Sequence, residues 1–144
     1  MFRRNTLLIA TLMAALFGVT PGAYAIVNCP NPEPGLPATF VYFDIGSTQI
    51  NAEGMAKIED AVKRIKDLYI RKVCLTGKAD KQGNAAANMD LSIRRADAVA
   101  NALIHKGVNA QIISISGKGE AYGDWITMFQ NSPQDRSVRI VLTR

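Results

Sequence analysis

Apolar residues recur at helical spacing in two stretches of the chain, with polar residues on the opposite side of each stretch. The first stripe consists of Met55, Ile58, Val62, Ile65 and Leu68. The second stripe consists of Ile93, Ala96, Val99, Ala100 and Leu103. Asn51 is a favourable cap before the first stripe, and Gly107 is a typical stop after the second. The pattern therefore predicts one helix that begins after residue 51 and a second over residues 89–106.

Short runs of β-branched and aromatic residues predict strands over residues 39–43, 72–76, 112–116 and 138–142. The polar, glycine-containing residues 78–87 are expected to form a loop, and a short helix is expected around residues 124–129. Because strands alternate with helices, we expect parallel neighbours joined by right-handed crossovers. The predicted fold is an α/β two-layer sandwich of β-α-β-α-β-β order, with a mixed sheet and helices on one face.

The first 25 residues have the features of a secretory signal peptide. Arg3 and Arg4 precede an apolar stretch, and Ala23 and Ala25 are the small residues that a signal peptidase recognises. The alternative is a membrane anchor, but the apolar residues 7–19 are fewer than the roughly 20 needed to span a bilayer. We therefore expect cleavage after Ala25 and export of the mature chain. A lipoprotein would carry a small residue directly before its modified cysteine. Asn28 precedes Cys29 here, so no lipid is expected on Cys29.

The remaining chain is predicted to be a lead-in followed by one domain. Four prolines lie within residues 28–37, which excludes a helix or a central strand there and predicts an extended lead-in over residues 26–37. The domain is then expected over residues 38–144. A chain of 144 residues that is 48% apolar is long enough for one packed core and too short for two.

Export bears on the two cysteines. Disulfides persist in oxidising compartments, so Cys29 and Cys74 are expected to pair, with two free thiols as the alternative. In the strand over residues 72–76, Val73 and Leu75 alternate with Cys74, which directs Cys74 away from the face that its apolar neighbours bury. This orientation favours the Cys29–Cys74 disulfide.

The charge excludes some function classes. The formal net charge of +5 falls to +3 when Arg3 and Arg4 leave with the signal peptide, and basic residues alternate with acidic ones, which argues against nucleic-acid binding. One histidine and two cysteines cannot supply the four ligands of a structural zinc site without carboxylates, and no other cofactor is indicated. His105 falls at a helix end, where it is expected to interact with carbonyls rather than act in catalysis. No enzyme is predicted.

One arrangement indicates ligand binding. Asp80 follows a predicted strand, and Arg95 lies two turns into the next helix, so a carboxylate and a guanidinium could flank one crevice at the end of the sheet. Such a pair suits a zwitterion, because arginine binds a carboxylate and aspartate accepts hydrogen bonds from an ammonium. The alternatives are an ordinary salt bridge, or a solvated face on which Arg94 and Arg95 point into water.

Residues 88–99, which include the start of the second predicted helix, contain the pattern N-x-x-L-S-x-x-R-A-x-x-V, formed by Asn88, Leu91, Ser92, Arg95, Ala96 and Val99. This pattern resembles the OmpA C-terminal domain family, shared by the peptidoglycan-associated lipoprotein and MotB-type stator proteins. The segments 42–44, 80–83, 117–120 and 136–138 follow in the family's order, so the resemblance covers residues 38–144.

The resemblance implies non-covalent binding of peptidoglycan through the diaminopimelate of its stem peptide. Asp80 would hold the ammonium of that residue and Arg95 its carboxylate. Asn88 would donate a hydrogen bond nearby, backbone amides after Asp44 would close the site, and Arg136 would keep a guanidinium available. Four residues depart from the family pattern: Lys78 and Ala79 replace a histidine and a threonine, and Asp135 and Ser137 replace an asparagine and an arginine.

The sequence therefore predicts a non-catalytic periplasmic module that anchors or positions an envelope component on the cell wall. An outer-membrane or envelope-complex protein is the expected partner class besides peptidoglycan, and the pattern specifies no oligomeric state. The alternative is a structural adaptor with the same fold that binds a protein of a secretion or motor assembly and not the cell wall. Its basis is Trp125, Met128 and Phe129, which would form a protein-binding patch if exposed.

Overall fold

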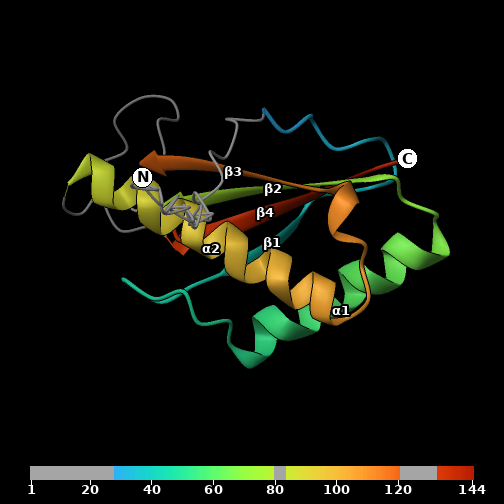
Figure 1. Ribbon diagram of the computed structural model, residues 1–144, viewed down its shortest axis with the longest axis horizontal. Helices are drawn as coiled ribbons and strands as arrows, with labels where there is room; N and C mark the ends of the chain where they lie inside the picture. Colours follow the sequence, from blue (N-terminus) through green and yellow to red (C-terminus); the bar gives the residue numbers. More distant parts are fainter. Residues whose placement is uncertain (1–27, 80–83, 121–132) are drawn as a thin grey trace, which may run out of the picture.

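The computed structural model describes residues 28–79, 84–120 and 133–144, which form a four-stranded sheet with two long helices (Figure 1). In chain order the elements are β1 (Thr39–Tyr42), α1 (Ala52–Asp67), β2 (Lys72–Ala79), α2 (Ala85–His105), the 3-10 helix η1 (Ala110–Ile112), β3 (Ile113–Glu120), the 3-10 helix η2 (Pro133–Asp135) and β4 (Ser137–Thr143). The predicted signal peptide, Asp80 and the expected helix around residues 124–129 lie outside the described residues, as do Trp125, Met128 and Phe129.

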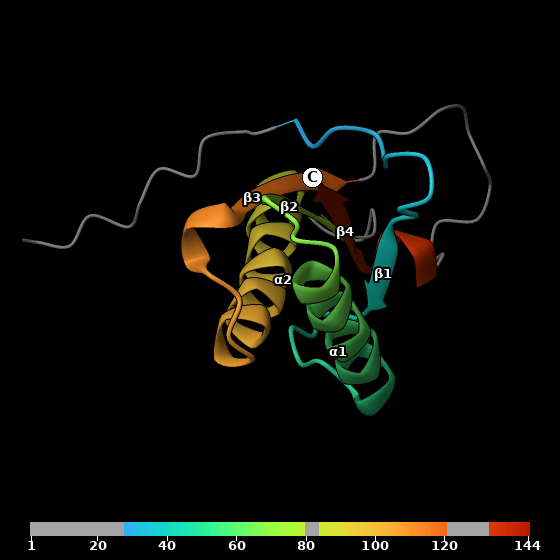
Figure 2. The ribbon, with the colours of Figure 1, turned by 90° about the vertical axis from the view of Figure 1, so that its right-hand side faces the viewer.

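The strand order in the sheet is β1-β4-β2-β3. Strands β2 and β3 are parallel, whereas β4 pairs antiparallel with both β1 and β2. Both helices lie on one face of this sheet, as the end-on view in Figure 2 shows. The two-layer sandwich and the mixed sheet are therefore confirmed. The expected parallel neighbours occur once only among the described strands, because β4 is inserted between β1 and β2.

The two helices begin at asparagine caps. The side chain of Asn51 accepts a hydrogen bond of 2.8 Å from the amide of Gly54, and that of Asn84 accepts one of 2.7 Å from Ala86. Helix α2 therefore starts at Ala85, earlier than the predicted residue 89. The sequence interpretation gave residues 85–87 to a loop, but these are alanines, the residue with the highest helix propensity, and they extend the helix once Asn84 caps it.

Strands β2 and β3 both run past the glycines at which the sequence predicted that they end. Gly77 and Gly117 are partners in the parallel ladder, and helix α2 crosses directly over them. A β-carbon at Gly77 would lie 1.8 Å from the carbonyl oxygen of Ser92, and one at Gly117 would lie 2.6 Å from a side-chain carbon of Ile93. The glycines thus allow close approach of the helix to the sheet and do not break the strands.

The hydrophobic core fills the space between the sheet and the helices. Its fully buried members include Ile58, Leu75, Val99, Leu103 and Ile140. Leu36 of the lead-in also belongs to this core, with 1% of its surface exposed. The lead-in is therefore packed on the domain and does not merely precede it.

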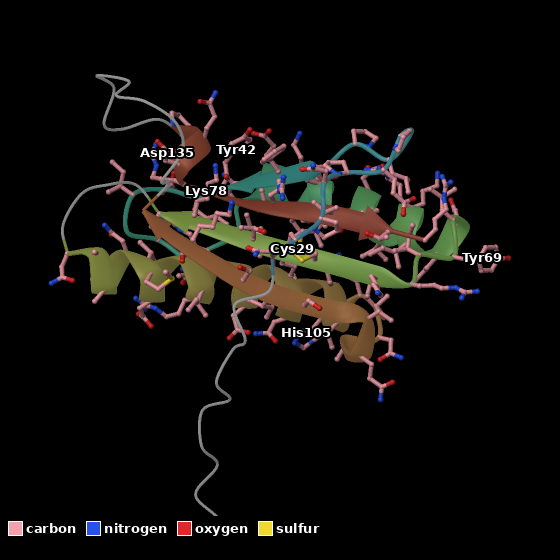
Figure 3. The ribbon with its side chains drawn as sticks, turned by 90° about the horizontal axis from the view of Figure 1, so that it is seen from above. Cys29, Tyr42, Tyr69, Lys78, His105 and Asp135 are labelled. Carbon is pink, nitrogen blue, oxygen red and sulfur yellow. A yellow bond between two sulfur atoms is a disulfide. The ribbon has the colours of Figure 1, made fainter. Side chains whose placement is uncertain are left out.

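The predicted disulfide between Cys29 and Cys74 is confirmed, with Cα atoms 5.5 Å apart. Cys74 lies outside the main core cluster, while its neighbours Val73 and Leu75 lie within it, as the strand alternation predicted. Figure 3 shows Cys29 above the sheet, and Figure 2 shows the lead-in on the side opposite the helices. Within the described ranges, no helix is both long and apolar enough to cross a membrane.

Candidate ligand-binding site

Arg95 is the centre of the candidate site. It is wholly buried, and its guanidinium donates hydrogen bonds to three backbone carbonyl oxygens from two other parts of the chain. Nε donates to Ser47 at 2.9 Å, Nη1 to Lys78 at 3.0 Å and Nη2 to Asp44 at 2.9 Å. These bonds join α2, the end of β2 and the turn after β1. The alternative that Arg95 points into water is therefore wrong.

The turn over residues 44–47 is closed by a hydrogen bond of 3.1 Å from the amide of Ser47 to the carbonyl of Asp44. Gly46 adopts a φ of 65°, in the left-handed region that favours glycine. Within the described chain, the amides of Ile45 and Gly46 donate no hydrogen bond, and both residues are exposed together with Asp44. This turn therefore presents amide donors at its surface.

Arg136 lies on the other side of the same turn. Its Nε donates to the carbonyl of Phe43 at 3.3 Å, and the amide of Phe43 donates to the carbonyl of Arg136 at 2.8 Å. The ring of Phe43 also receives the guanidinium of Arg95, 5.4 Å from its centroid, a cation–π distance. Phe43 thus lies between the two arginines and is in contact with both.

Asn88 lies in the first turns of α2, seven residues before Arg95. Residues seven apart are two turns apart on the same side of a helix, and Asn88 is accordingly buried, with 5% of its surface exposed. Arg94 has turned away from that side. It is exposed and pairs with Asp90 at 2.8 Å, so the solvated alternative holds for Arg94 alone.

The structure thus brings together most of the predicted site residues. Two hydrogen bonds and a cation–π contact connect Asp44, Arg95 and Arg136 through the segment 43–47, and Asn88 shares the buried side of α2. Asp80 directly follows the last residue of β2 and lies outside the described residues. Figure 3 shows the labelled Tyr42, Lys78 and Asp135 near one another at one end of the sheet, whereas Tyr69 lies at the opposite end.

Two contributors to the site were missed from the sequence. The carbonyls of Ser47 and Lys78 hold the guanidinium, and main-chain acceptors have no signature in residue type. The ring of Phe43 could have been found, because it directly precedes Asp44 at the end of an aromatic strand.

His105 is exposed at the last residue of α2. Among the described residues, no group of three or more histidine, cysteine or carboxylate side chains could hold a metal ion.

The sequence model of the OmpA family matches residues 42–137, which is more than half of the chain, and the chain belongs to that family. Outer membrane protein P5 of Haemophilus influenzae is 37% identical over 81 residues, which are 56% of this chain and 23% of that protein. Outer membrane protein A of Shigella flexneri is 32% identical over 108 residues, which are 69% of this chain and 31% of that protein. The chain thus spans less than a third of the length of these relatives.

Solved structures support the same assignment. The OmpA-like domain of FopA1 from Francisella tularensis superposes with a TM-score of 0.65 at 27% identity, covering 74% of this chain and 71% of that one. The peptidoglycan-associated lipoprotein from Burkholderia pseudomallei gives a TM-score of 0.62 at 25% identity, covering 73% of this chain and 90% of that one. The C-terminal domain of Helicobacter pylori MotB gives 0.61 at 26% identity, covering 74% and 84%.

These matches define the class of the protein. OmpA-like domains, including those of the peptidoglycan-associated lipoprotein and MotB, are non-catalytic structural or binding modules, and the fold confirms that this chain is one of them. Its relatives are envelope or periplasmic proteins, consistent with a periplasmic module associated with the cell wall.

Proposed function

We propose that this protein binds peptidoglycan by gripping the zwitterionic end of the diaminopimelate residue in its stem peptide. The observation that carries the proposal is the position of Arg95, whose guanidinium joins α2, the end of β2 and the turn after β1. A buried, fixed cation at the meeting point of three segments suits an anionic ligand group, since charge-assisted hydrogen bonds are strong where water is excluded.

Each predicted residue has a separate role in this proposal. Asp80 accepts hydrogen bonds from the ammonium of diaminopimelate, and Arg95 supplies the positive charge for its carboxylate. The turn after Asp44 adds the amides of Ile45 and Gly46, which donate to no other group within the described chain. Asn88 and Arg136 flank the ligand from α2 and from the start of β4.

Arg95 also has a positioning role that follows directly from its contacts. Its bonds to the carbonyls of Asp44 and Ser47 fix both ends of the turn whose amides are proposed to bind. A wall-binding module of this kind would anchor or position an envelope component in the periplasm, after removal of the signal peptide. The partner it positions would be an outer-membrane or envelope-complex protein.

The proposal is tested by co-sedimentation of the purified protein with two kinds of sacculi. Sacculi with diaminopimelate in the stem peptide should carry the protein into the pellet. Sacculi with lysine at that position lack the side-chain carboxylate, so binding should fall at least tenfold. Equal sedimentation with both kinds would contradict recognition of diaminopimelate, and sedimentation with neither would contradict wall binding and favour the adaptor.

A further inference from the structure

The face of the sheet opposite the helices contains a cavity that is distinct from the ligand-binding turn of the candidate site. It has a volume of about 190 Å³ and is lined by Phe40, Thr76, Lys78, Lys118 and Arg139. These residues come from all four strands of the sheet. In the strand registers, Arg139 is the partner of Phe40 on β1 and of Thr76 on β2. The cavity is therefore built across neighbouring strands.

Among the described residues that line the cavity, the polar ones are cationic apart from one hydroxyl. Lys78, Lys118 and Arg139 contribute three positive charges, and none of the described lining residues is a carboxylate. Within the described part of the chain, none of the three side chains makes a hydrogen bond or an ion pair. Three unneutralised cations around one cavity repel one another, so an anionic partner gains from all three at once.

The cavity also offers an apolar wall and a recessed floor. Phe40 is 38% exposed and stacks on Tyr42, with ring centroids 6.4 Å apart and planes at 17°. Thr76, by contrast, is only 3% exposed. An anionic group that also carries methylene groups can place its charge on the cations and its carbon atoms on Phe40.

The size and surroundings favour a peptide over a membrane surface or a free small molecule. Pockets for whole small molecules are about 300 to 1,000 Å³, so this cavity accommodates one acidic side chain at a time. The lead-in is attached to the same face through Cys29 and Cys74, and Figure 2 shows it on the side of the sheet opposite the helices. A flat bilayer would meet the lead-in first, whereas a narrow chain segment fits beside it.

We propose that this open face of the sheet is a docking surface for an acidic peptide segment of a partner protein. Arg139, Lys78 and Lys118 surround the carboxylate of one inserted side chain, and Phe40 contacts its methylene groups. This surface lies on the face opposite α2 and does not depend on binding of peptidoglycan.

The test uses a fluorescein-labelled hexaglutamate peptide and fluorescence anisotropy at low and physiological salt. The double variant Lys118→Gln/Arg139→Gln removes two of the cations and spares Lys78, whose carbonyl belongs to the candidate site. The control variant Lys57→Gln/Lys63→Gln removes the same charge from exposed positions on α1. Circular dichroism confirms that each variant is folded, and sacculus binding of each is measured in parallel.

The parent protein and the α1 variant should both bind the peptide. The Lys118→Gln/Arg139→Gln variant should bind the peptide at least tenfold more weakly, while its binding to sacculi stays unchanged. Binding should weaken as salt rises, because the contacts are electrostatic. Equal losses in both variants would overturn the proposal, because they would show a general charge effect. The proposal is also overturned if the parent protein does not bind the peptide. The same holds if the parent protein binds phosphatidylglycerol vesicles through these cations and does not bind the peptide.

Discussion

The guanidinium of Arg95 donates a hydrogen bond of 2.9 Å to the backbone carbonyl of Asp44, a residue that precedes it by 51 positions. A second bond, to the carbonyl of Ser47, holds the other end of the same turn. The shape of the turn therefore depends on a side chain that α2 delivers. Because the turn is exposed and the guanidinium is buried, a ligand bound on the turn is supported by a charge that water does not reach.

Arg95→Ala is expected to lower the free energy of unfolding by about 3 to 5 kcal/mol, because three backbone carbonyls lose a charged donor and a cavity remains where the buried side chain was. Arg95→Lys should recover only part of this loss, since an ammonium cannot reproduce the planar fork. Urea unfolding measures both. Arg94→Ala is the control, and it should stay within about 0.5 kcal/mol of the parent because Arg94 is exposed. Equal effects at positions 94 and 95 would contradict the structural role of Arg95.

Gly77→Ala should destabilise the fold by roughly 3 kcal/mol, since the new β-carbon would meet the backbone of α2 at Ser92 and neither backbone can yield without separating helix and sheet. Gly46→Ala is the comparison. A β-carbon there meets no atom within 4 Å, and only the φ of 65° is unfavourable, which costs about 1 to 2 kcal/mol. Thermal or urea unfolding should rank Gly77→Ala as the more damaging change. The reverse ranking would show that α2 does not approach the sheet as closely as described.

Loss of the disulfide is expected to lower stability without abolishing the fold. The bridge joins residues 45 positions apart, for which chain entropy gives about 4 kcal/mol. The core between sheet and helices does not include either cysteine, so the domain should still fold. Unfolding of Cys29→Ser/Cys74→Ser in urea, compared with the parent, measures the difference. A variant of unchanged stability, or one that is unfolded in the absence of urea, would disagree with this assignment.

Processing provides a further prediction. Protein recovered from the periplasm should begin at Ile26, with no lipid on Cys29, because the sulfur of Cys29 is bonded to Cys74 and is not available for acylation. Intact-mass spectrometry under non-reducing conditions reads both features together. A diacylglyceryl group on Cys29, or a chain that still starts at Met1, would disprove it.

Most of the fold follows from residue periodicity, and the misplaced ends of β2 and β3 have one physical cause. The stripes at residues 55–68 and 93–103 predicted the helices because each has one apolar side facing a sheet. The sequence predicts strand ends at Gly77 and Gly117, but a glycine that makes room for a helix has the same appearance in sequence as a glycine in a turn. The insertion of β4 between β1 and β2 is a long-range pairing, which local patterns do not encode.

The site was predictable in its residue types and less so in its geometry. Residues seven apart, such as Asn88 and Arg95, lie on one side of a helix, and Arg94 is turned away from that side. Spacing could not reveal that Arg95 is wholly buried, because its partners are backbone carbonyls of residues 44, 47 and 78. The basic cavity on the open face also had no sequence signal, since its cations come from three strands far apart in the chain.

The central claim is that Asp80 and Arg95 together hold the zwitterionic end of diaminopimelate, and the most direct measurement is co-sedimentation of Asp80→Ala with diaminopimelate-type sacculi. Removal of one partner of a desolvated charge pair costs about 2 to 5 kcal/mol, so the folded variant should bind more than tenfold more weakly than the parent. Arg95→Lys should also bind more weakly, while Arg94→Ala should bind like the parent. If folded Asp80→Ala sediments as fully as the parent, Asp80 does not hold the ligand and the proposed clamp is wrong.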